Sequence, residues 1–395
     1  MKLEAKWHVL IGGLLSYIFD CFDLILLSVA LPTIIKDLGL SLVTGGLLAT
    51  ATFLGIGLSV FVLGWYADNY GRKKAMILSL VSFGLFTAAT AFANNAETIL
   101  ALRFLAGVGL GGLWNICATY VAETWPASQR AMATGVVLGA FPIGSALAAT
   151  IAGLVLPRYG WRALFLFGAV SLLAALYVYL FVPETDAWKQ QKAAAASEEK
   201  KQSVGIGELF GKDLRWRTVI GTIAASFALV GSWGVLTWIP TFITKVRGFD
   251  TVFMSQWMLY MSAGMLVGYL VAGYLADMVG RKVVVAAMFI CNVIVTPLLV
   301  LAASASTLLW LAPAWGFGAA YAGLFGTIFA EMFPVRVRAL GTGFCFNIGR
   351  AFTALCPVVL GAIGAAYGLQ VGIMLCAGAF FLAAVSAVML PRTGQ

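Results

Sequence analysis

The stretch GWYADNYGRKK, from Gly64 to Lys74, occurs twice in the chain. Its second copy reads GYLADMVGRK, from Gly273 to Lys282. Each copy lies between two apolar runs, and about twenty apolar residues are enough for a helix to span a bilayer. The stretch is therefore predicted to be a short loop that joins two membrane-spanning helices.

A second pair of stretches repeats with nearly the same offset, about 208 residues. The first reads ETWPASQRAMATG from Glu123, and the second reads EMFPVRVRALGTG from Glu331. One duplicated unit therefore fills the whole chain. Membrane proteins built from repeated halves are typically transporters whose binding site lies between the halves.

The composition supports a polytopic membrane protein. Of all residues, 62% are hydrophobic and 10% are charged, whereas soluble domains contain about 25% charged residues. Apolar runs predict twelve transmembrane helices, near 8–31, 44–67, 75–93, 98–121, 131–155, 162–182, 218–243, 253–276, 282–303, 305–330, 338–364 and 368–390. The predicted fold class is all-α, with two pseudo-symmetric halves of six helices each.

We expect three parts along the chain: a six-helix bundle over 1–182, a cytoplasmic linker over 183–217 and a second bundle over 218–395. The linker contains many Ala, Glu, Lys and Gln residues, which favour helix, so short amphipathic helices are expected there. An even number of spans keeps the second half in the orientation of the first. The repeats should therefore be parallel, related by an axis along the membrane normal.

The formal net charge of +9 reflects topology. With both termini cytoplasmic, most lysines and arginines fall in cytoplasmic loops, as the positive-inside rule requires. The basic balance is therefore a consequence of topology, and nucleic-acid binding is not expected. Membrane lipids are expected partners, with Arg72, Lys73 and Lys74 at the cytoplasmic lipid surface. The six cysteines all fall in predicted spans without metal-type spacing. We expect no metal, no cofactor and no enzyme activity, since no nucleotide loop or catalytic motif is present.

The residue types of the repeated loop suit particular physical roles. Gly64 and Gly71 permit close helix approach and a tight turn, and Asp68 is able to accept from helix N-terminal amides or pair with an arginine. Because the motif recurs, we interpret it as a latch that closes the cytoplasmic side in one state. Simple anchoring of the topology is the alternative. The helix-end glutamates Glu123 and Glu331 are expected to be the partners of the loop arginines. The other residues of the predicted gating set are Arg72, Asp277, Arg281, Arg130 and Arg338.

Over essentially its whole length, the chain resembles the major facilitator superfamily. The duplicated loop is similar to the signature of that superfamily. RFLAGVGLGG from Arg103 resembles its fourth-helix motif, and PETD at 183–186 resembles its usual end to the sixth helix. The resemblance implies a twelve-helix carrier that works by alternating access. The Gly-Pro antiporter signature of the fifth helix is absent, which disfavours a drug/proton antiporter.

Three stretches are similar to organic-acid/proton symporters of that superfamily. FDCFD at 19–23 resembles the first-helix signature of aromatic-acid and of sialate or lactate symporters, with Cys21 where glycine is usual. ATYVAETWPA at 118–127 is similar to the sialate and monocarboxylate branch. NIGR at 347–350 is similar to the aromatic-acid branch. Both branches remain open at this point.

Charged residues inside predicted spans are functional candidates because burying a charge in a bilayer is costly. Asp20 and Asp23 lie three residues apart and therefore on one helix face. Two carboxylates in a low-dielectric groove repel each other, so we expect at least one to hold a proton near neutral pH. Arg103 lies at a depth compatible with Asp23. We predict a switchable Asp23–Arg103 pair that couples proton movement to transport; a fixed structural bridge is the alternative.

Arg350 lies in the middle of the predicted eleventh span with no acidic neighbour in sequence. An arginine in a wet cavity is a natural anchor for a carboxylate. The alternative is an internal partner, for which Asp20 across the cavity is the candidate. Further polar and aromatic residues of the predicted spans complete the predicted substrate-binding set, although each alone more often packs than binds: Asn347, Asn115, Tyr120, Trp233, Gln256 and Tyr321.

The sequence therefore predicts a monomeric, multi-pass carrier of the bacterial inner membrane. Its predicted task is uptake of a small organic anion together with protons. A symporter of sugar or another neutral solute, or an exporter, is the first alternative, and Arg350 argues against a neutral substrate. A membrane sensor is the second alternative, but such a protein should carry a soluble signalling domain.

Overall fold

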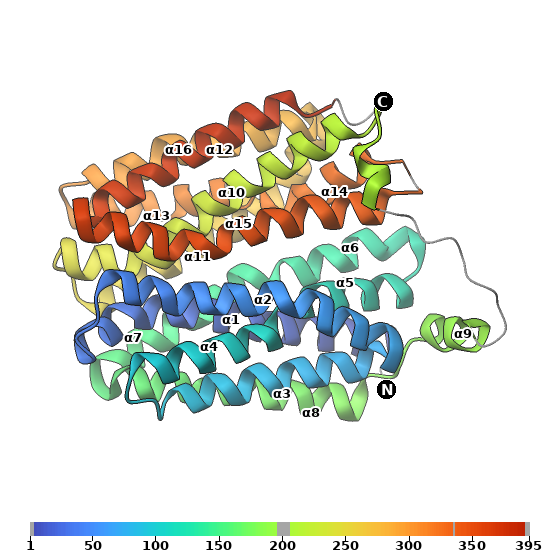
Figure 1. Ribbon diagram of the computed structural model, residues 1–395, viewed down its shortest axis with the longest axis horizontal. Coiled ribbons are helices and arrows are strands. Elements are labelled where there is room, and N and C mark those ends of the chain that lie inside the picture. The colour runs from blue at the N-terminus through green and yellow to red at the C-terminus, as the bar shows by residue number, and fades with distance from the viewer. Residues whose placement is uncertain (1–3, 196–205, 335, 392–395) are drawn as a thin grey trace. The chain divides into compact units, whose positions relative to one another are not determined.

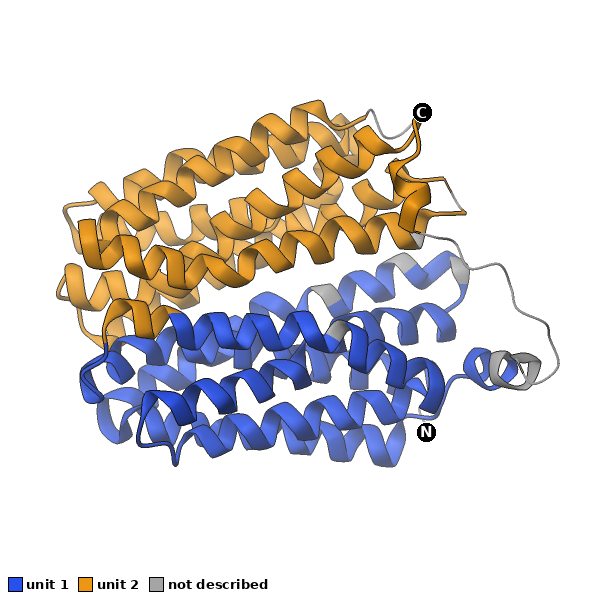
Figure 2. Cartoon of the chain, viewed as in Figure 1, with its two compact units in different colours: residues 1–40, 47–201 blue, residues 41–46, 202–395 orange. Residues whose placement is uncertain are grey.

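The computed structural model describes residues 4–195, 206–334 and 336–391, and these residues form helices without any strand (Figure 1). The predicted all-α fold class is confirmed. The chain divides into two compact units, residues 1–40 with 47–201 and residues 41–46 with 202–395 (Figure 2). Their boundary falls within the predicted linker 183–217, of which 196–205 lie outside the described residues.

Unit 1 contains the long helices of the first repeat and the first part of the linker. Its helices are α1 (Ala5–Asp37), α2 (Leu42–Tyr70), α3 (Arg72–Thr90), α4 (Ala96–Leu110), α5 (Leu113–Thr124), α6 (Ala127–Leu138), α7 (Ala140–Leu166), η1 (Phe167–Val170), α8 (Ser171–Phe181) and α9 (Asp186–Ala195). The first turn of α2 is assigned to unit 2.

Unit 2 repeats this order of long helices. Its elements are η2 (Ile206–Phe210), α10 (Arg215–Thr241), η3 (Phe242–Val246), α11 (Thr251–Val279), α12 (Arg281–Leu301), α13 (Ala305–Ala319), α14 (Ala322–Met332), α15 (Arg338–Tyr367) and α16 (Leu369–Met389).

Among the described residues, 11 helical runs are long and apolar enough to cross a membrane. One of them, Ser128–Phe181, has 54 residues, about twice the length that a bilayer requires. Gly160 interrupts this run with φ 72° and ψ −176°, between the predicted spans 131–155 and 162–182. Divided there, the chain provides the twelve spans predicted from the sequence.

Close packing of α2 on α4 brings two polar residues together. On α4, a Cβ added to Gly107 would lie 3.1 Å from Cα of Gly55 and 3.0 Å from the carbonyl carbon of Thr52. Small residues at such points let membrane helices approach closely. Arg103 lies one turn before Gly107 on α4, so this approach places its side chain against Thr52.

The fourth span of each unit is broken at the equivalent point. In unit 1, α4 ends at Leu110 and α5 begins at Leu113; in unit 2, α13 ends at Ala319 and α14 begins at Ala322. In unit 2 the buried Asn292 of α12 lies against this break. Its amide nitrogen donates to the Trp315 carbonyl at 3.1 Å, and its oxygen accepts from the Ala319 N–H at 3.2 Å. The side chain thus satisfies backbone groups beside the break.

At one end of unit 1, an arginine bonds to residues at the ends of two other helices. We call this group (Asp37, Ala93, Trp161 and Arg162) the unit 1 corner. Asp37 at the end of α1 accepts from Trp161 Nε1 at 2.8 Å and from Arg162 Nη1 at 2.7 Å. Nη2 of Arg162 donates to the Ala93 carbonyl just beyond α3 at 3.2 Å. The corner therefore links three helix ends and pairs its guanidinium with a carboxylate.

Candidate functional site

A fully buried ion pair lies inside unit 1. Asp23 of α1 is 1% exposed and Arg103 of α4 is 0% exposed. Nη2 of Arg103 lies 2.7 Å from Oδ2 of Asp23, and Nη1 lies 3.2 Å from Oδ1. This is the bidentate geometry in which an arginine binds a carboxylate most strongly. The contact predicted from the sequence is present; its role in coupling stays a prediction.

Two threonines complete the pair. Thr87 of α3 donates to Oδ1 of Asp23 at 2.5 Å and accepts from Nη1 of Arg103 at 2.9 Å. Thr52 of α2 accepts from Nε of Arg103 at 3.3 Å. The cluster therefore joins α1, α2, α3 and α4 through hydrogen bonds, as a buried charge requires. Sequence reasoning missed both threonines because Thr side chains in apolar helices usually bond to their own backbone.

Asp20 lies about one turn from Asp23 on α1 and is also buried, at 4% exposure. The ion pair of Arg103 is with Asp23 and not with Asp20. The two carboxylates therefore occupy different surroundings although they share a helix face.

Arg350 of α15 is half-buried, and its guanidinium carbon lies 5.5 Å from the ring centre of Phe346 on the same helix. No carboxylate within the described ranges forms an ion pair with it. Asn347 lies three residues earlier and therefore on the same face; it is also half-buried. The two residues share one surface of α15, as the predicted substrate-binding set requires.

The remaining predicted substrate contacts fall into two groups. Asn115 of α5 and Gln256 of α11 are exposed, and Trp233 of α10 is buried. Tyr120 and Tyr321 need correction, because both are 1% exposed and both hydroxyls are used internally. Tyr120 donates to the Pro183 carbonyl, and Tyr321 donates to the Ala228 carbonyl at 2.8 Å. They hold helix ends and helix pairs together instead of facing a ligand.

The repeated loop is built around a glycine in the left-handed region. Gly71 has φ 109° and its counterpart Gly280 has φ 93°, a conformation that favours glycine. The tight turn predicted here is therefore present in both units. A Cβ added to Gly64 would meet no atom within 4 Å, so packing within unit 1 does not require a glycine there, and the predicted gating role of Gly64 stays a prediction.

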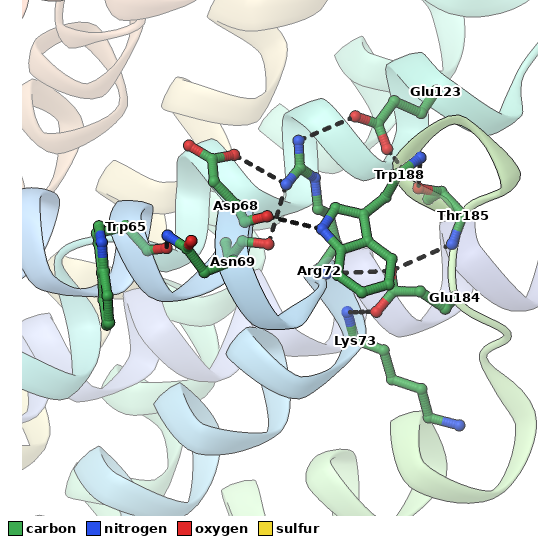
Figure 3. A network of polar contacts seen from close by, with 10 residues as sticks. Trp65, Asp68, Asn69, Arg72, Lys73, Glu123, Glu184, Thr185 and Trp188 are labelled. Atoms are coloured by element: carbon green, nitrogen blue, oxygen red, sulfur yellow. Dashed lines mark hydrogen bonds and ion pairs between the residues drawn. The ribbon is translucent and has the colours of Figure 1, made fainter. Parts of the chain in front are cut away.

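Arg72 is the centre of a polar network at this loop (Figure 3). Its Nη1 donates to Asp68 Oδ1 at 2.8 Å and to the Ala67 carbonyl at 2.9 Å. Its Nη2 donates to Glu123 of α5 at 3.3 Å. The predicted pairing of the loop arginine with Asp68 and Glu123 is therefore present in unit 1.

Glu184, which follows α8, occupies the N-terminus of α3 (Figure 3). Its carboxylate accepts from the backbone N–H groups of Arg72 at 3.0 Å and Lys73 at 3.1 Å, which would otherwise be unpaired at a helix start. The sequence offered Asp68 as a possible acceptor for these amides, but Glu184 takes that role. The PETD stretch at 183–186 was the sequence feature that pointed to Glu184.

The first part of the linker is attached to the same network. Thr185 Oγ1 donates to Glu123 at 2.6 Å, and Trp188 Nε1 of α9 donates to the Asp68 carbonyl at 2.8 Å. The network therefore joins the loop between α2 and α3, the end of α5 and the start of α9 (Figure 3).

Unit 2 repeats only part of this arrangement. Arg281 forms an ion pair with Glu331, and its distance to Asp277 is 4.0 Å. The counterpart of Glu184 in the repeat is an arginine, at position 392, outside the described residues. Within the described residues, no contact joins Arg130 or Arg338 to either network: Arg130 is exposed, and Arg338 donates to the Phe333 carbonyl. Their place in the gating set stays a prediction.

Replacing Glu184 with glutamine should lower the thermal stability of the chain. Two helix N-terminal amides would lose a charged acceptor, and hydrogen bonds to charged groups contribute about 1.5–3 kcal/mol each. We expect Glu184→Gln to lose about 2 kcal/mol, measured by thermal unfolding in detergent. Glu208→Gln, which affects only the exposed pair with Arg336, is the control and should change little. Equal melting temperatures for both variants would contradict this role of Glu184.

The Major Facilitator Superfamily sequence model matches residues 13–320. The chain is 30% identical over 385 residues to the cis,cis-muconate transport protein of Acinetobacter baylyi, covering 96% of this chain and 93% of that protein. It is 27% identical to the sialic acid transporter NanX of Escherichia coli, covering 94% and 90%. It is 26% identical to the gallate transporter of Pseudomonas putida, covering 94% and 87%.

Solved structures share the fold at lower identity. A crystal structure of a bacterial homologue of the human lysosomal transporter Spinster has a TM-score of 0.78 at 16% identity and covers 100% of both chains. The crystal structure of a D-xylose–proton symporter has a TM-score of 0.78 at 16% identity, covering 99% of this chain and 98% of that one.

Proposed function

Since the chain belongs to the major facilitator superfamily, and is therefore a multi-pass membrane transporter and not an enzyme, we propose that it takes up an organic carboxylate together with protons by alternating access. We further propose that it acts in the bacterial inner membrane with both termini cytoplasmic. The distribution of lysine and arginine supports this orientation.

Arg350 is the observation that carries the carboxylate assignment. A half-buried guanidinium on a membrane-spanning helix, without a carboxylate partner in the described chain, favours an anion from outside the protein. Asn347 on the same face would add an amide for orientation. The relatives with 26–30% identity include transporters named for muconate, sialic acid and gallate, which are all organic acids.

The proton would be carried by the carboxylates of α1. In the cluster of Asp23, Arg103, Thr87 and Thr52, protonation of Asp23 would remove the negative charge that Arg103 binds. The cost of a buried, unpaired guanidinium would then favour a different arrangement of the helices. Asp20, which lacks an ion pair with Arg103, is the second candidate carrier.

The networks around Arg72 and Arg281 are proposed to act as the latch of the transport cycle. Each places one arginine between a loop aspartate and a glutamate at the end of another helix. Opening the loop would separate charges that pair in the closed arrangement. The greater number of contacts in unit 1 would make its loop the more firmly held of the two.

Uptake into proteoliposomes tests the proposal. We expect accumulation of cis,cis-muconate or gallate under an inward proton gradient and its loss when a protonophore is added, because the gradient supplies the driving force. Xylose is the control for the neutral-solute alternative, because a D-xylose–proton symporter shares the fold. Gradient-driven accumulation of xylose but of none of the acids would contradict the proposal.

A further inference from the structure

An open crevice of about 460 Å³ lies in unit 2 where the ends of α12 and η3 meet the start of α16. Its volume falls in the range of ligand pockets. Most of its lining is apolar, and two residues are polar; the lining includes Phe242, Val246, Val300 and Met374 together with Arg247 and Gln370.

The two polar residues of the lining lie at helix ends, as do the apolar Val246 and Leu301. Gln370 is the second residue of α16, and Met374 lies about one turn, roughly 5 Å, further along this helix. Arg247 directly follows η3, whereas Phe242 is the first residue of that element. The crevice therefore combines a mostly apolar lining with one guanidinium and one amide, which suits a ligand with a charged head and a hydrocarbon body.

Arg247 is the charged residue of the crevice lining. Its Nη2 donates to the carbonyl groups of Val300, at 3.1 Å, and Ala302, which lie at the end of α12. Within the described chain no carboxylate forms an ion pair with it. The nearest acidic residue in sequence, Asp250, accepts instead from the Phe253 N–H at 2.8 Å as the cap of α11. Nη1 and Nε of Arg247 thus remain for another acceptor.

The unit 1 corner offers a comparison, in which the arginine comes from another position of the repeat: with the offset of 208 residues, the counterpart of Arg162 is Gln370. There, Arg162 also donates to a carbonyl beyond the end of the third span, but it pairs with Asp37 at 2.7 Å. With the offset of 208 residues, the counterpart of Asp37 is Lys245. Where unit 1 supplies a carboxylate, unit 2 therefore carries a second cation, and Lys245 is exposed.

The crevice continues an apolar surface on α12. Ile290, Ile294, Leu298 and Leu301 are all exposed and recur at helical spacing, so they form one stripe along the helix. In a membrane-spanning helix an exposed apolar stripe of this kind faces acyl chains. Leu301 belongs to both the stripe and the crevice, so the crevice opens toward lipid.

We propose that this crevice binds an anionic phospholipid, with its phosphate at Arg247 and Lys245 and one acyl chain along the apolar lining. Charge complementarity selects the head, since Arg247 lines the crevice without a carboxylate partner in the described chain and the exposed Lys245 lies two residues before it. The proposal concerns a lipid of the surrounding membrane and holds whichever solute the protein carries.

Thermal unfolding of the purified full chain in detergent tests this site with phosphatidylglycerol as the probe. We expect phosphatidylglycerol to raise the melting temperature, and phosphatidylcholine and soluble glycerol 3-phosphate to leave it unchanged. Lys245→Asp introduces the residue type that the repeat has in unit 1. It should weaken phosphatidylglycerol binding, titrated by the same shift, by about tenfold or more, because one cation near the phosphate becomes an anion.

Lys36→Asp is the matched control, since it makes the same charge change beside the unit 1 corner and should keep the effect of phosphatidylglycerol. Arg247→Lys should weaken the effect without removing it, because the charge stays and the planar fork is lost. Equal stabilisation by both lipids, an equal shift with glycerol 3-phosphate, or an unchanged effect in Lys245→Asp would each overturn the proposal.

Discussion

Asp23→Asn is expected to abolish proton-driven uptake and to destabilise the protein. The amide keeps the shape of the side chain and is able to bond to Thr87, but it leaves Arg103, which is 0% exposed, without a counter-charge. Removing one partner of a buried pair costs about 3–5 kcal/mol. Uptake in proteoliposomes and thermal unfolding measure the two effects separately.

A second variant separates coupling from stability. Asp23→Asn combined with Arg103→Gln removes both buried charges, so much of the lost stability should return, while uptake should stay absent. Asp186→Asn, which affects an exposed pair with Lys189, is the matched control and should change neither quantity. If Asp23→Asn still accumulated substrate against its gradient, the pair would be only structural.

Arg350→Ala is expected to raise the KM for the carboxylate without lowering stability. A charged hydrogen-bonding anchor contributes about 2–3 kcal/mol, which corresponds to roughly a 30- to 150-fold change in affinity. Stability should hold because Arg350 has no ion pair with any residue in the described ranges. Initial rates of uptake over a range of substrate concentrations, together with thermal unfolding, give both values.

The conservative change sharpens this test. Arg350→Lys retains the charge but loses the planar fork that binds a carboxylate with two parallel bonds, so its KM should lie between those of the parent and Arg350→Ala. Arg338→Ala, on the same helix and bonded only to a carbonyl, is the control. An unchanged KM in both Arg350 variants would refute the anchor.

The sequence was sufficient to predict the architecture, because a bilayer restricts the choices. Backbone groups in lipid must be satisfied within a helix or a closed barrel, so the length of each apolar run nearly determines the element. The duplicated loop then showed which positions of the two halves correspond. The exact helix ends were less accessible: the breaks after Leu110 and Ala319 depend on contacts such as that of Asn292, which involve another helix.

The site was predicted in part. Asp23 and Arg103 stood out because isolated charges in apolar spans need a partner. Thr52 and Thr87 did not, because a hydroxyl in such a helix is commonplace and only the packing of four helices turns it toward the pair. Tyr120 was assigned to substrate for the opposite reason: its hydroxyl was visible in the sequence, but its acceptor, the Pro183 carbonyl, lies 63 residues away along the chain.

The buried pair also has a consequence for how the protein enters the membrane during synthesis. A lone arginine or aspartate at the centre of an inserting helix costs about 2.5–3.5 kcal/mol. Because α1 is synthesised well before α4, its carboxylates reach the bilayer before Arg103 is available to neutralise Asp23. We therefore expect α1 to remain beside the insertion machinery until α4 arrives, so that the two helices leave it together.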